Sequence, residues 1–127
     1  MSAQILLVDD EPHVLRLMRL KLEGAGYRVD TAGNGKEGLQ KLQQQLPDVL
    51  ITDIQMPEMN GEQLCQAITE HWPDRRFLIV LLTSRTEVEH RRWSSGIDKL
   101  WFIEKPVSMR RLLDRLDDYI QVTPRQV

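Results

Sequence analysis

The sequence predicts an α/β domain in which five parallel strands alternate with five helices. Two observations along its 127 residues predict this fold: short apolar runs recur, and segments with helical periodicity separate them. Strands that alternate with helices pair in parallel through right-handed crossovers. The expected architecture is therefore an open, doubly wound five-stranded sheet with helices on both faces, and the length fits one such domain.

Five segments carry the pattern of a β-strand. The run Phe77–Leu82 carries it most strongly, because six apolar residues follow one another before a polar Thr-Ser pair. Continuous apolar runs are typical of strands that are buried on both faces of a parallel sheet. The other predicted strands are Ile5–Val8, Val29–Ala32, Val49–Ile51 with the following Thr52 and Asp53, and Leu100–Ile103.

Helical periodicity is present between the strands. The segment Pro12–Glu23 has a proline in its first turn and glycines after its last. A second helix follows the turn at 33–35, and we expect it to place Leu39, Leu42 and Leu46 on its buried face. The remaining predicted helices lie between Gly61 and Pro73, over Glu87–Ser95, and from Met109 to about Ile120 after an N-cap at Ser108.

Composition and charge exclude several classes of function. With 17 basic and 19 acidic residues the net charge is −2, which lacks the positive field that attracts a nucleic-acid backbone. The single cysteine, Cys65, cannot form an intrachain disulfide, and we expect it to be a small buried apolar residue. No stretch approaches the roughly 18 apolar residues of a membrane-spanning helix. We expect a cytoplasmic protein with neither a nucleic-acid nor a membrane partner.

The residues that end the predicted strands are unusually polar. Ligands of an open α/β sheet bind beside the carboxyl ends of its strands, so these residues are the first candidates for a site. Three carboxylates close together repel one another, and a divalent cation such as Mg²⁺ relieves the repulsion. A carboxylate beside such an ion is also a competent nucleophile toward phosphorus. The candidates are Asp9, Asp10 and Glu11 after the first strand, Asp53 after the third, Thr83 and Ser84 after the fourth, and Lys105 after the fifth.

Each of these residues taken alone has an ordinary structural explanation. Asp9 and Asp10 could cap the helix that follows them, and Asp53 could be a turn residue. A lone Thr83 is more often a loop hydroxyl, and a lone Lys105 is usually solvated. Their joint occurrence at successive strand ends favours a functional site.

Four motifs stand in order along the chain: Ile5–Pro12, Asp48–Gly61, Leu82–Ser84 and Lys105–Pro106. Together they resemble the receiver domain of bacterial two-component response regulators, and the resemblance covers nearly the whole sequence. It implies a flavodoxin-like fold with strand order 2-1-3-4-5. We expect the receiver domain to cover residues 1–120, and the polar segment 121–127 with its single proline to be a C-terminal tail or the start of a linker.

The resemblance implies a Mg²⁺-dependent phosphoacceptor site. Asp53 would accept the phosphoryl group. Asp10, the Asp53 side chain and the backbone carbonyl of Gln55 would bind Mg²⁺, and Asp9 would assist through water. Gln55, two residues past Asp53, should border the phosphoryl group and could tune the access of hydrolytic water, so we also expect it to affect the lifetime of the phosphorylated state.

Residues on the last two strands would complete the switch that this family uses. Thr83 would hydrogen-bond the phosphoryl group, and Lys105 would pair with the charge of that group. In this family the bond between the lysine and the following proline is often cis, which would make Lys105–Pro106 a rigid turn that aims the ammonium. Movement of Thr83 would leave space for Phe102 to rotate, although Phe102 could also be a core residue only. Arg85 is a second candidate for tuning the phosphoryl lifetime.

The expected function is a phosphorylation-dependent signalling switch. It would receive phosphoryl from a sensor histidine kinase or phosphotransfer protein, with Mg²⁺ as cofactor, and would act on no external metabolite as an enzyme. The surface of its fourth helix, fifth strand and fifth helix would control a downstream effector or a covalently linked output domain, or form a phosphorylation-dependent homodimer.

The same residues leave three other functions open. One is a degenerate receiver that acts as a constitutive docking module, which the intact acidic set disfavours. Another is a haloacid-dehalogenase-like phosphohydrolase, although that family needs a second acid where this chain has Gln55. The last is a flavodoxin-like FMN module, whose flavin phosphate would meet Asp9 and Asp10.

Overall fold

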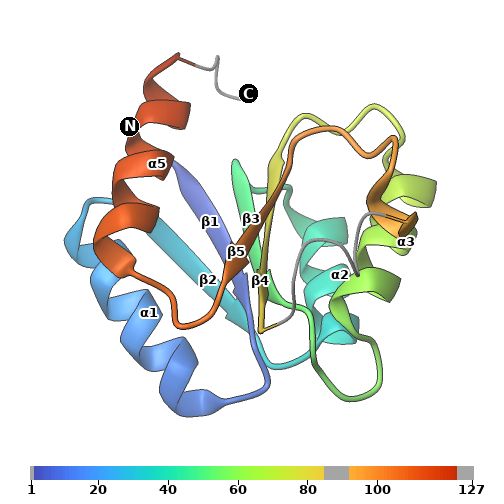
Figure 1. The fold of residues 1–127 in the computed structure, drawn as a ribbon, viewed down its shortest axis with the longest axis horizontal. Helices are drawn as coiled ribbons and strands as arrows, with labels where there is room; N and C mark the ends of the chain where they lie inside the picture. The colour runs from blue at the N-terminus through green and yellow to red at the C-terminus, as the bar shows by residue number, and fades with distance from the viewer. Residues whose placement is uncertain (1, 85–91, 123–127) are drawn as a thin grey trace.

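A computed structural model describes residues 2–84 and 92–122 and confirms the predicted fold class. Five parallel strands form one sheet in the order β2-β1-β3-β4-β5 (Figure 1). The edge strands are β2 and β5, and β1, β3 and β4 lie between them. The strands are β1 Gln4–Val8, β2 Arg28–Ala32, β3 Val49–Asp53, β4 Leu78–Thr83 and β5 Leu100–Glu104.

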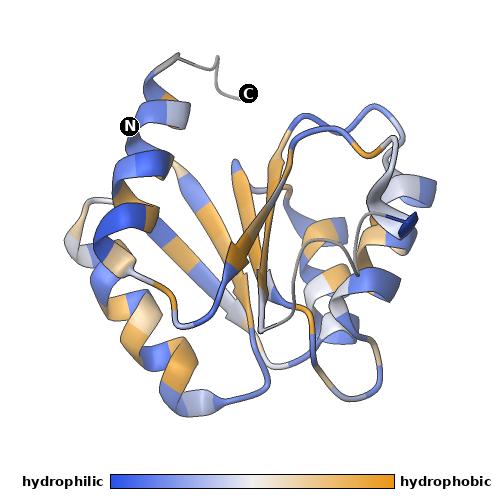
Figure 2. Ribbon diagram, viewed as in Figure 1, coloured by the Kyte–Doolittle hydropathy of each residue, from blue (hydrophilic) through white to orange (hydrophobic). Residues whose placement is uncertain are grey.

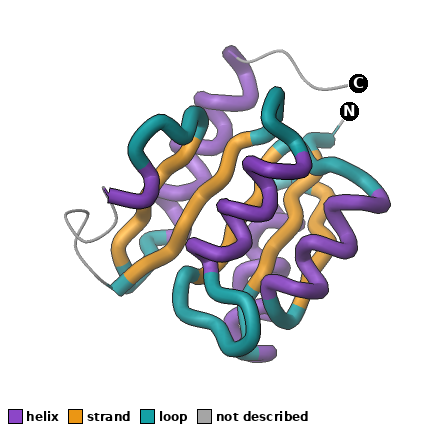
Figure 3. Tube along the Cα trace, turned by 90° about the vertical axis from the view of Figure 1, so that its right-hand side faces the viewer, coloured by secondary structure: helices purple, strands orange, loops and turns teal. Residues whose placement is uncertain are grey.

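Helices cover both faces of the sheet. The described helices are α1 Pro12–Gly24, α2 Gly35–Gln44, α3 Gly61–His71 and α5 Met109–Val122. One face carries α1 and α5, and the opposite face carries α2 and α3 (Figure 1). Figure 3 looks onto a face of the sheet, with helices in front of the strands and behind them. Of the predicted helix Glu87–Ser95, residues 92–94 are helical and residues 85–91 lie outside the described part of the chain.

The alternation of side chains along each strand divides the core into two layers. On β1, Ile5 and Leu7 face α1 and α5, whereas Leu6 and Val8 face α2 and α3. All residues of β3 and β4 are buried, as their continuous apolar sequence predicts. In Figure 2 the hydrophobic residues accordingly gather along the strands and on the inner sides of the helices.

Side-chain caps define where three helices begin. The Asn34 side chain accepts a hydrogen bond of 2.8 Å from the backbone N–H of Glu37 at the start of α2. At the start of α3, Asn60 and Gln63 form a reciprocal capping box. The Ser108 hydroxyl accepts a hydrogen bond of 3.3 Å from the first turn of α5, as predicted for an N-cap.

The prediction for Leu46 was wrong. The helix α2 ends at Gln44, and Gln45 is extended with φ −157° and ψ 125°, so Leu46 lies beyond the helix and is 39% exposed. The physical reason is Pro47, because a residue that precedes proline is disfavoured in helical conformation. Periodicity alone therefore extended the apolar face of this helix too far.

The last helix extends slightly beyond its predicted end at about Ile120. The helix α5 continues to Val122, so residues 121 and 122 are helical, and residues 123–127 lie outside the described part.

Among the helices that the structure describes, none is both long and apolar enough to cross a membrane.

Cys65 lies on the inner side of α3, in the core, with no exposed surface, as predicted. Burial raises the pKa of its thiol to about 12, so the reactive thiolate is scarce at neutral pH. We expect no reaction of native protein with a thiol reagent at pH 7, and complete reaction after unfolding in guanidinium. Rapid labelling of the native protein, followed by absorbance, would contradict this burial.

An acidic site at the carboxyl edge of the sheet

Neighbouring strands bring three carboxylates together. Strands β1 and β3 pair side by side with Val8 opposite Thr52, so the residues that follow these two positions meet at one edge. They are Asp9 and Asp53, and Asp10 lies next to them. Ligand oxygens of the three aspartates all lie within 4.8 Å of one another. The sequence predicted this juxtaposition from the strand ends alone.

The three aspartates differ in their surroundings. Asp9 is 2% exposed and Asp53 is 6% exposed, whereas Asp10 is open to solvent. Backbone amides orient the two buried carboxylates: the N–H of Glu11 donates to Asp9 Oδ1 at 2.9 Å, and the N–H of Gln55 donates to Asp53 Oδ1 at 3.3 Å. The buried pair is thus held by the loops that leave β1 and β3.

Lys105 joins the site from the far edge of the sheet. Its Nζ lies 2.8 Å from Asp53 Oδ2, and its backbone N–H donates to the carbonyl of Thr83 at 2.7 Å. The peptide bond to Pro106 is cis, as the resemblance implied. Lys105 and Gln55 therefore hold different oxygens of the same Asp53 carboxylate.

Thr83 and Phe102 lie on neighbouring strands. Thr83 is the last residue of β4, is 3% exposed and pairs with Glu104, while Phe102 pairs with Leu81. Since alternate residues of a strand share a face, the side chains of Thr83 and Phe102 point to the same side of the sheet. Arg85, the other residue expected at this edge, lies outside the described residues.

Burial and like charge disfavour ionisation of Asp9. Burial raises the pKa of Asp9 above its usual value, the Glu11 amide lowers it, Asp53 and Asp10 raise it further, and Lys105 lowers it. When all three carboxylates are ionised they carry three negative charges, and the cation that contacts them among the described residues is Lys105 with one positive charge. The two excess charges at this edge require compensation.

The whole chain was compared with known proteins. The family model for the response regulator receiver domain matches residues 5–117. The chain belongs to the response regulator receiver domains. The receiver is 34% identical over 119 residues to the transcriptional regulatory protein GlrR of Escherichia coli, covering 94% of this chain and 26% of GlrR. It is also 34% identical to an uncharacterized 14.6 kDa protein of Leptolyngbya boryana, covering 94% of this chain and 92% of that protein.

Solved structures agree with the family. The chemotaxis protein CheY4 of Vibrio cholerae superposes on the receiver with a TM-score of 0.83 at 30% identity, covering 93% of this chain and 98% of that one. The receiver spans only part of several curated transcriptional regulators that it matches, from 26% to 51% of their length.

The acidic cluster of the receiver has a composition that fits Mg²⁺. Its ligand atoms are carboxylate oxygens, the hard donors that Mg²⁺ prefers, and they are close enough to share one ion. The two excess negative charges match a divalent cation. One aspartate is open to solvent, which suits an ion that keeps several of its waters.

Two glycines support the loop between Asp53 and α3. A Cβ atom at Gly61 would lie 2.8 Å from the Cα of Ile54 and 3.1 Å from the Asp53 carbonyl oxygen. A Cβ atom at Gly35, on α2, would lie 2.5 Å from the Met59 carbonyl oxygen. The sequence predicts Gly35 only as a turn residue, because contact between α2 and this loop leaves no mark on either segment.

Substitution of Gly35 tests this support. We expect Gly35→Ala to lower the free energy of unfolding by about 1–3 kcal/mol, because the loop backbone must move to admit a methyl group. Gly24→Ala is the matched control, since a Cβ atom there meets nothing within 4 Å. Urea unfolding measures both variants, and equal stabilities would contradict the packing described here.

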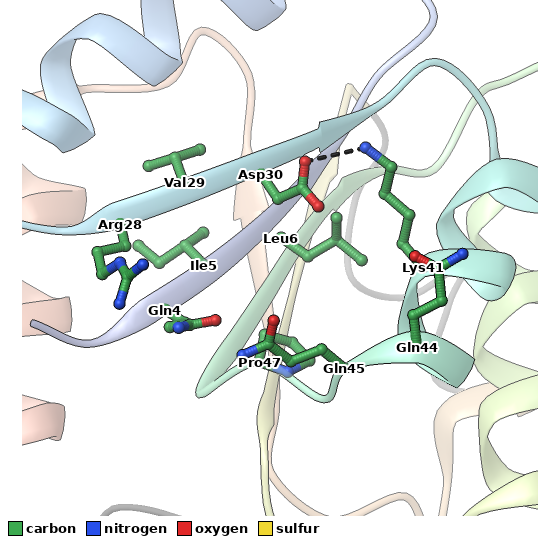
Figure 4. A pocket seen from close by; sticks show the side chains of 10 residues that line it. All are labelled: Gln4, Ile5, Leu6, Arg28, Val29, Asp30, Lys41, Gln44, Gln45 and Pro47. Atoms are coloured by element: carbon green, nitrogen blue, oxygen red, sulfur yellow. Dashed lines mark hydrogen bonds and ion pairs between the residues drawn. The ribbon is translucent and has the colours of Figure 1, made fainter.

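A separate groove of about 320 Å³ lies at the opposite, amino edge of β1 and β2 (Figure 4). An ion pair of 2.9 Å between Lys41 Nζ and Asp30 Oδ1 crosses its rim. Its other lining residues include Gln4 and Arg28 from the strands and Gln44 from α2. None of the aspartates of the acidic cluster lines this groove.

Proposed function

We propose that this receiver is a phosphorylation-dependent signalling switch that accepts a phosphoryl group on Asp53. The observation that carries the proposal is the Asp53 carboxylate, which Lys105 contacts at one oxygen and the Gln55 amide at the other, beside Asp9 and Asp10. A buried carboxylate with two oriented neighbours and an adjacent acidic pair is suited to nucleophilic attack beside a divalent ion.

The phosphoryl donor is a phosphohistidine of a sensor kinase or phosphotransfer protein. An Asp53 carboxylate oxygen attacks phosphorus and forms an O–P bond, while the P–N bond breaks and its electron pair remains on the imidazole nitrogen. The product is an aspartyl phosphate. The receiver thus catalyses its own modification and turns over no external metabolite.

Each neighbour of Asp53 has a role in this transfer. Asp10, the Asp53 side chain and the backbone carbonyl of Gln55 would hold Mg²⁺, with Asp9 acting through water. An ion held there would supply positive charge to offset the negative charge of the transferring group. Lys105 pairs with the charge of the phosphoryl group, and this ammonium already lies 2.8 Å from the Asp53 carboxylate.

Loss of the phosphoryl group by hydrolysis returns the switch to its starting state. Gln55 is exposed and follows Asp53 by two positions, and we expect its side chain to border the phosphoryl group and limit access of water. Arg85 has the corresponding position after Thr83 in the sequence. We expect exchange of either residue to change the rate of dephosphorylation.

The conformational change that follows phosphorylation is transmitted through Thr83 and Phe102. When Thr83 turns to donate its hydroxyl to the phosphoryl group, Phe102 moves on the same side of the sheet and alters the surface of residues 92–95, β5 and α5. This surface would contact a downstream effector, a linked output domain or a second phosphorylated copy. Several relatives are transcriptional regulators of which this receiver covers about half or less, which supports a linked output domain.

Phe102→Ala separates phosphorylation from the switch. We expect the variant to take up phosphoryl at the wild-type level, since Phe102 makes none of the contacts described for Asp53. It should lose the change in amide hydrogen exchange that Mg²⁺ with beryllofluoride, a phosphoryl analogue, produces in β5 of the wild type. A Phe102→Ala protein with the full exchange response would show that Phe102 is a core residue only.

Intact mass spectrometry tests the proposed function. After incubation with acetyl phosphate and Mg²⁺ the protein should gain a single phosphoryl group, and EDTA should prevent the gain. Absence of both phosphorylation and beryllofluoride binding would contradict the proposal and favour a constitutive docking module. Continuous release of phosphate from organic phosphoesters would instead favour a phosphohydrolase.

A further inference from the structure

Phe102 contacts a second aromatic ring that comes from a different segment of the chain. The rings of Phe102 and Trp93 meet edge to face, with centroids 5.9 Å apart and planes at 77°. Both side chains are partly buried and pack against the core layer beneath α2 and α3. Trp93 belongs to the helical residues 92–94, so this contact links that segment to β5.

The contact lies on the side of the sheet toward which Thr83 points. Phe102 and Leu81 are paired, Thr83 is paired with Glu104, and alternate positions of each strand share a face. A shift of the Phe102 ring toward the end of β4 would therefore change its contact with Trp93. The third ring of this region, Trp101, lies on the opposite face with Tyr119 and Arg115 and takes no part in the contact.

We propose that Trp93 is a positioning residue that holds the Phe102 ring in the unphosphorylated arrangement and transmits its movement to residues 92–94. The inference rests on the proposed function, because it needs Asp53 phosphorylation to move Phe102. An edge-to-face aromatic pair stabilises the state that contains it. If phosphorylation breaks the pair, linkage requires that removal of the pair strengthens binding of a phosphoryl group or its analogue.

The position of each tryptophan ring is measurable in the intact protein. Incorporation of 5-fluorotryptophan gives one fluorine resonance for each of Trp72, Trp93 and Trp101, assigned with single Trp→Phe variants. Addition of Mg²⁺ and beryllofluoride should shift the Trp93 resonance and leave that of Trp72, which lies at the end of α3 near the amino edge of the sheet, unchanged. In Phe102→Leu the Trp93 shift should disappear.

A variant then measures the coupling. We expect Trp93→Leu to bind beryllofluoride in the presence of Mg²⁺ roughly two- to tenfold more tightly than the wild type, because it lacks the ring pair of the unphosphorylated state. Trp72→Leu is the matched control and should bind with wild-type affinity. A purely structural role of Trp93 would lower stability and leave the affinity unchanged.

The outcomes separate this inference from the proposed function. Bound beryllofluoride with an unmoved Trp93 resonance, or a Trp93→Leu affinity equal to that of the wild type, overturns the role of Trp93 and leaves the phosphoacceptor intact. Absence of beryllofluoride binding together with absence of phosphoryl gain in the mass spectrum overturns both.

Discussion

Asp53→Asn is expected to abolish phosphoryl uptake and to leave the protein folded. The amide has nearly the shape of the carboxylate but lacks the anionic oxygen that attacks phosphorus. The change also removes one of three neighbouring negative charges, so it lowers the repulsion among the carboxylates in the folded state. Intact mass after incubation with acetyl phosphate and Mg²⁺ measures uptake, and circular dichroism measures folding.

A second Asp→Asn substitution controls for general effects of charge. Asp74 is exposed and lies between α3 and β4, at the other edge of the sheet. Asp74→Asn should gain one phosphoryl group as the wild type does. Uptake by a folded Asp53→Asn protein would assign the phosphoacceptor to a different residue.

Asp9→Asn is expected to stabilise the protein in the absence of Mg²⁺. Asp9 is 2% exposed, and the pKa of its carboxyl is raised, above all by burial and further by Asp53 and Asp10. At neutral pH the ionised side chain therefore destabilises the folded state, and asparagine removes this charge. We expect the free energy of unfolding in EDTA at pH 7 to rise by about 1 kcal/mol or more, the order of one like-charge repulsion at this distance.

The pH dependence of this effect has a definite sign. The folded state raises the pKa of Asp9, so folded protein binds more protons than unfolded protein between the two pKa values. Stability therefore falls as pH rises from the usual pKa of aspartate through the raised one, and the loss is complete above it. The advantage of Asp9→Asn should shrink as pH is lowered through this window.

Magnesium should reduce the stability advantage of Asp9→Asn over the wild type. The ion offsets the repulsion among the three aspartates, so the wild type should gain more stability from Mg²⁺ than Asp9→Asn does. Urea unfolding in EDTA and in Mg²⁺, with Asp74→Asn as control, measures both gains. A lower stability of Asp9→Asn in EDTA would contradict the electrostatic account of the site.

The order of the elements could be predicted from the sequence because each local signal agrees with the global fold. Continuous apolar runs such as Phe77–Leu82 predict central strands, and capping and helix-stop residues predict most helix ends. Leu46 was misplaced because a residue before proline loses helical preference while it keeps the apolar spacing. Periodicity and local preference conflict at this point, and the local preference decides.

Contacts between distant segments leave weaker signals. The guanidinium of Arg75 donates to the carbonyls of Phe77 and Asp98 and, at 3.2 Å, to that of Lys99, so it joins the amino ends of β4 and β5. No spacing in the sequence predicts this clamp, because its acceptors are backbone groups that every residue carries. The contact between Trp93 and Phe102 was also missed, since it depends on how a poorly amphipathic segment packs.

The candidate site was more predictable than these contacts. Parallel strands bring their carboxyl ends to one edge, so Asp9, Asp10, Asp53 and Lys105 could be placed together from the strand pattern. Their different burial could not be predicted, because it depends on the loops after β1 and β3. Burial is nevertheless what distinguishes the shielded Asp9 and Asp53 from the exposed Asp10.

Localisation of the phosphoryl group tests the central claim most directly. The protein is phosphorylated with acetyl phosphate and Mg²⁺, digested at acidic pH, and its peptides are fragmented by mass spectrometry. The account predicts that the phosphoryl group lies on Asp53 and that no peptide is modified when EDTA replaces Mg²⁺. A phosphoryl group on any other residue, or uptake that persists in EDTA, would contradict it.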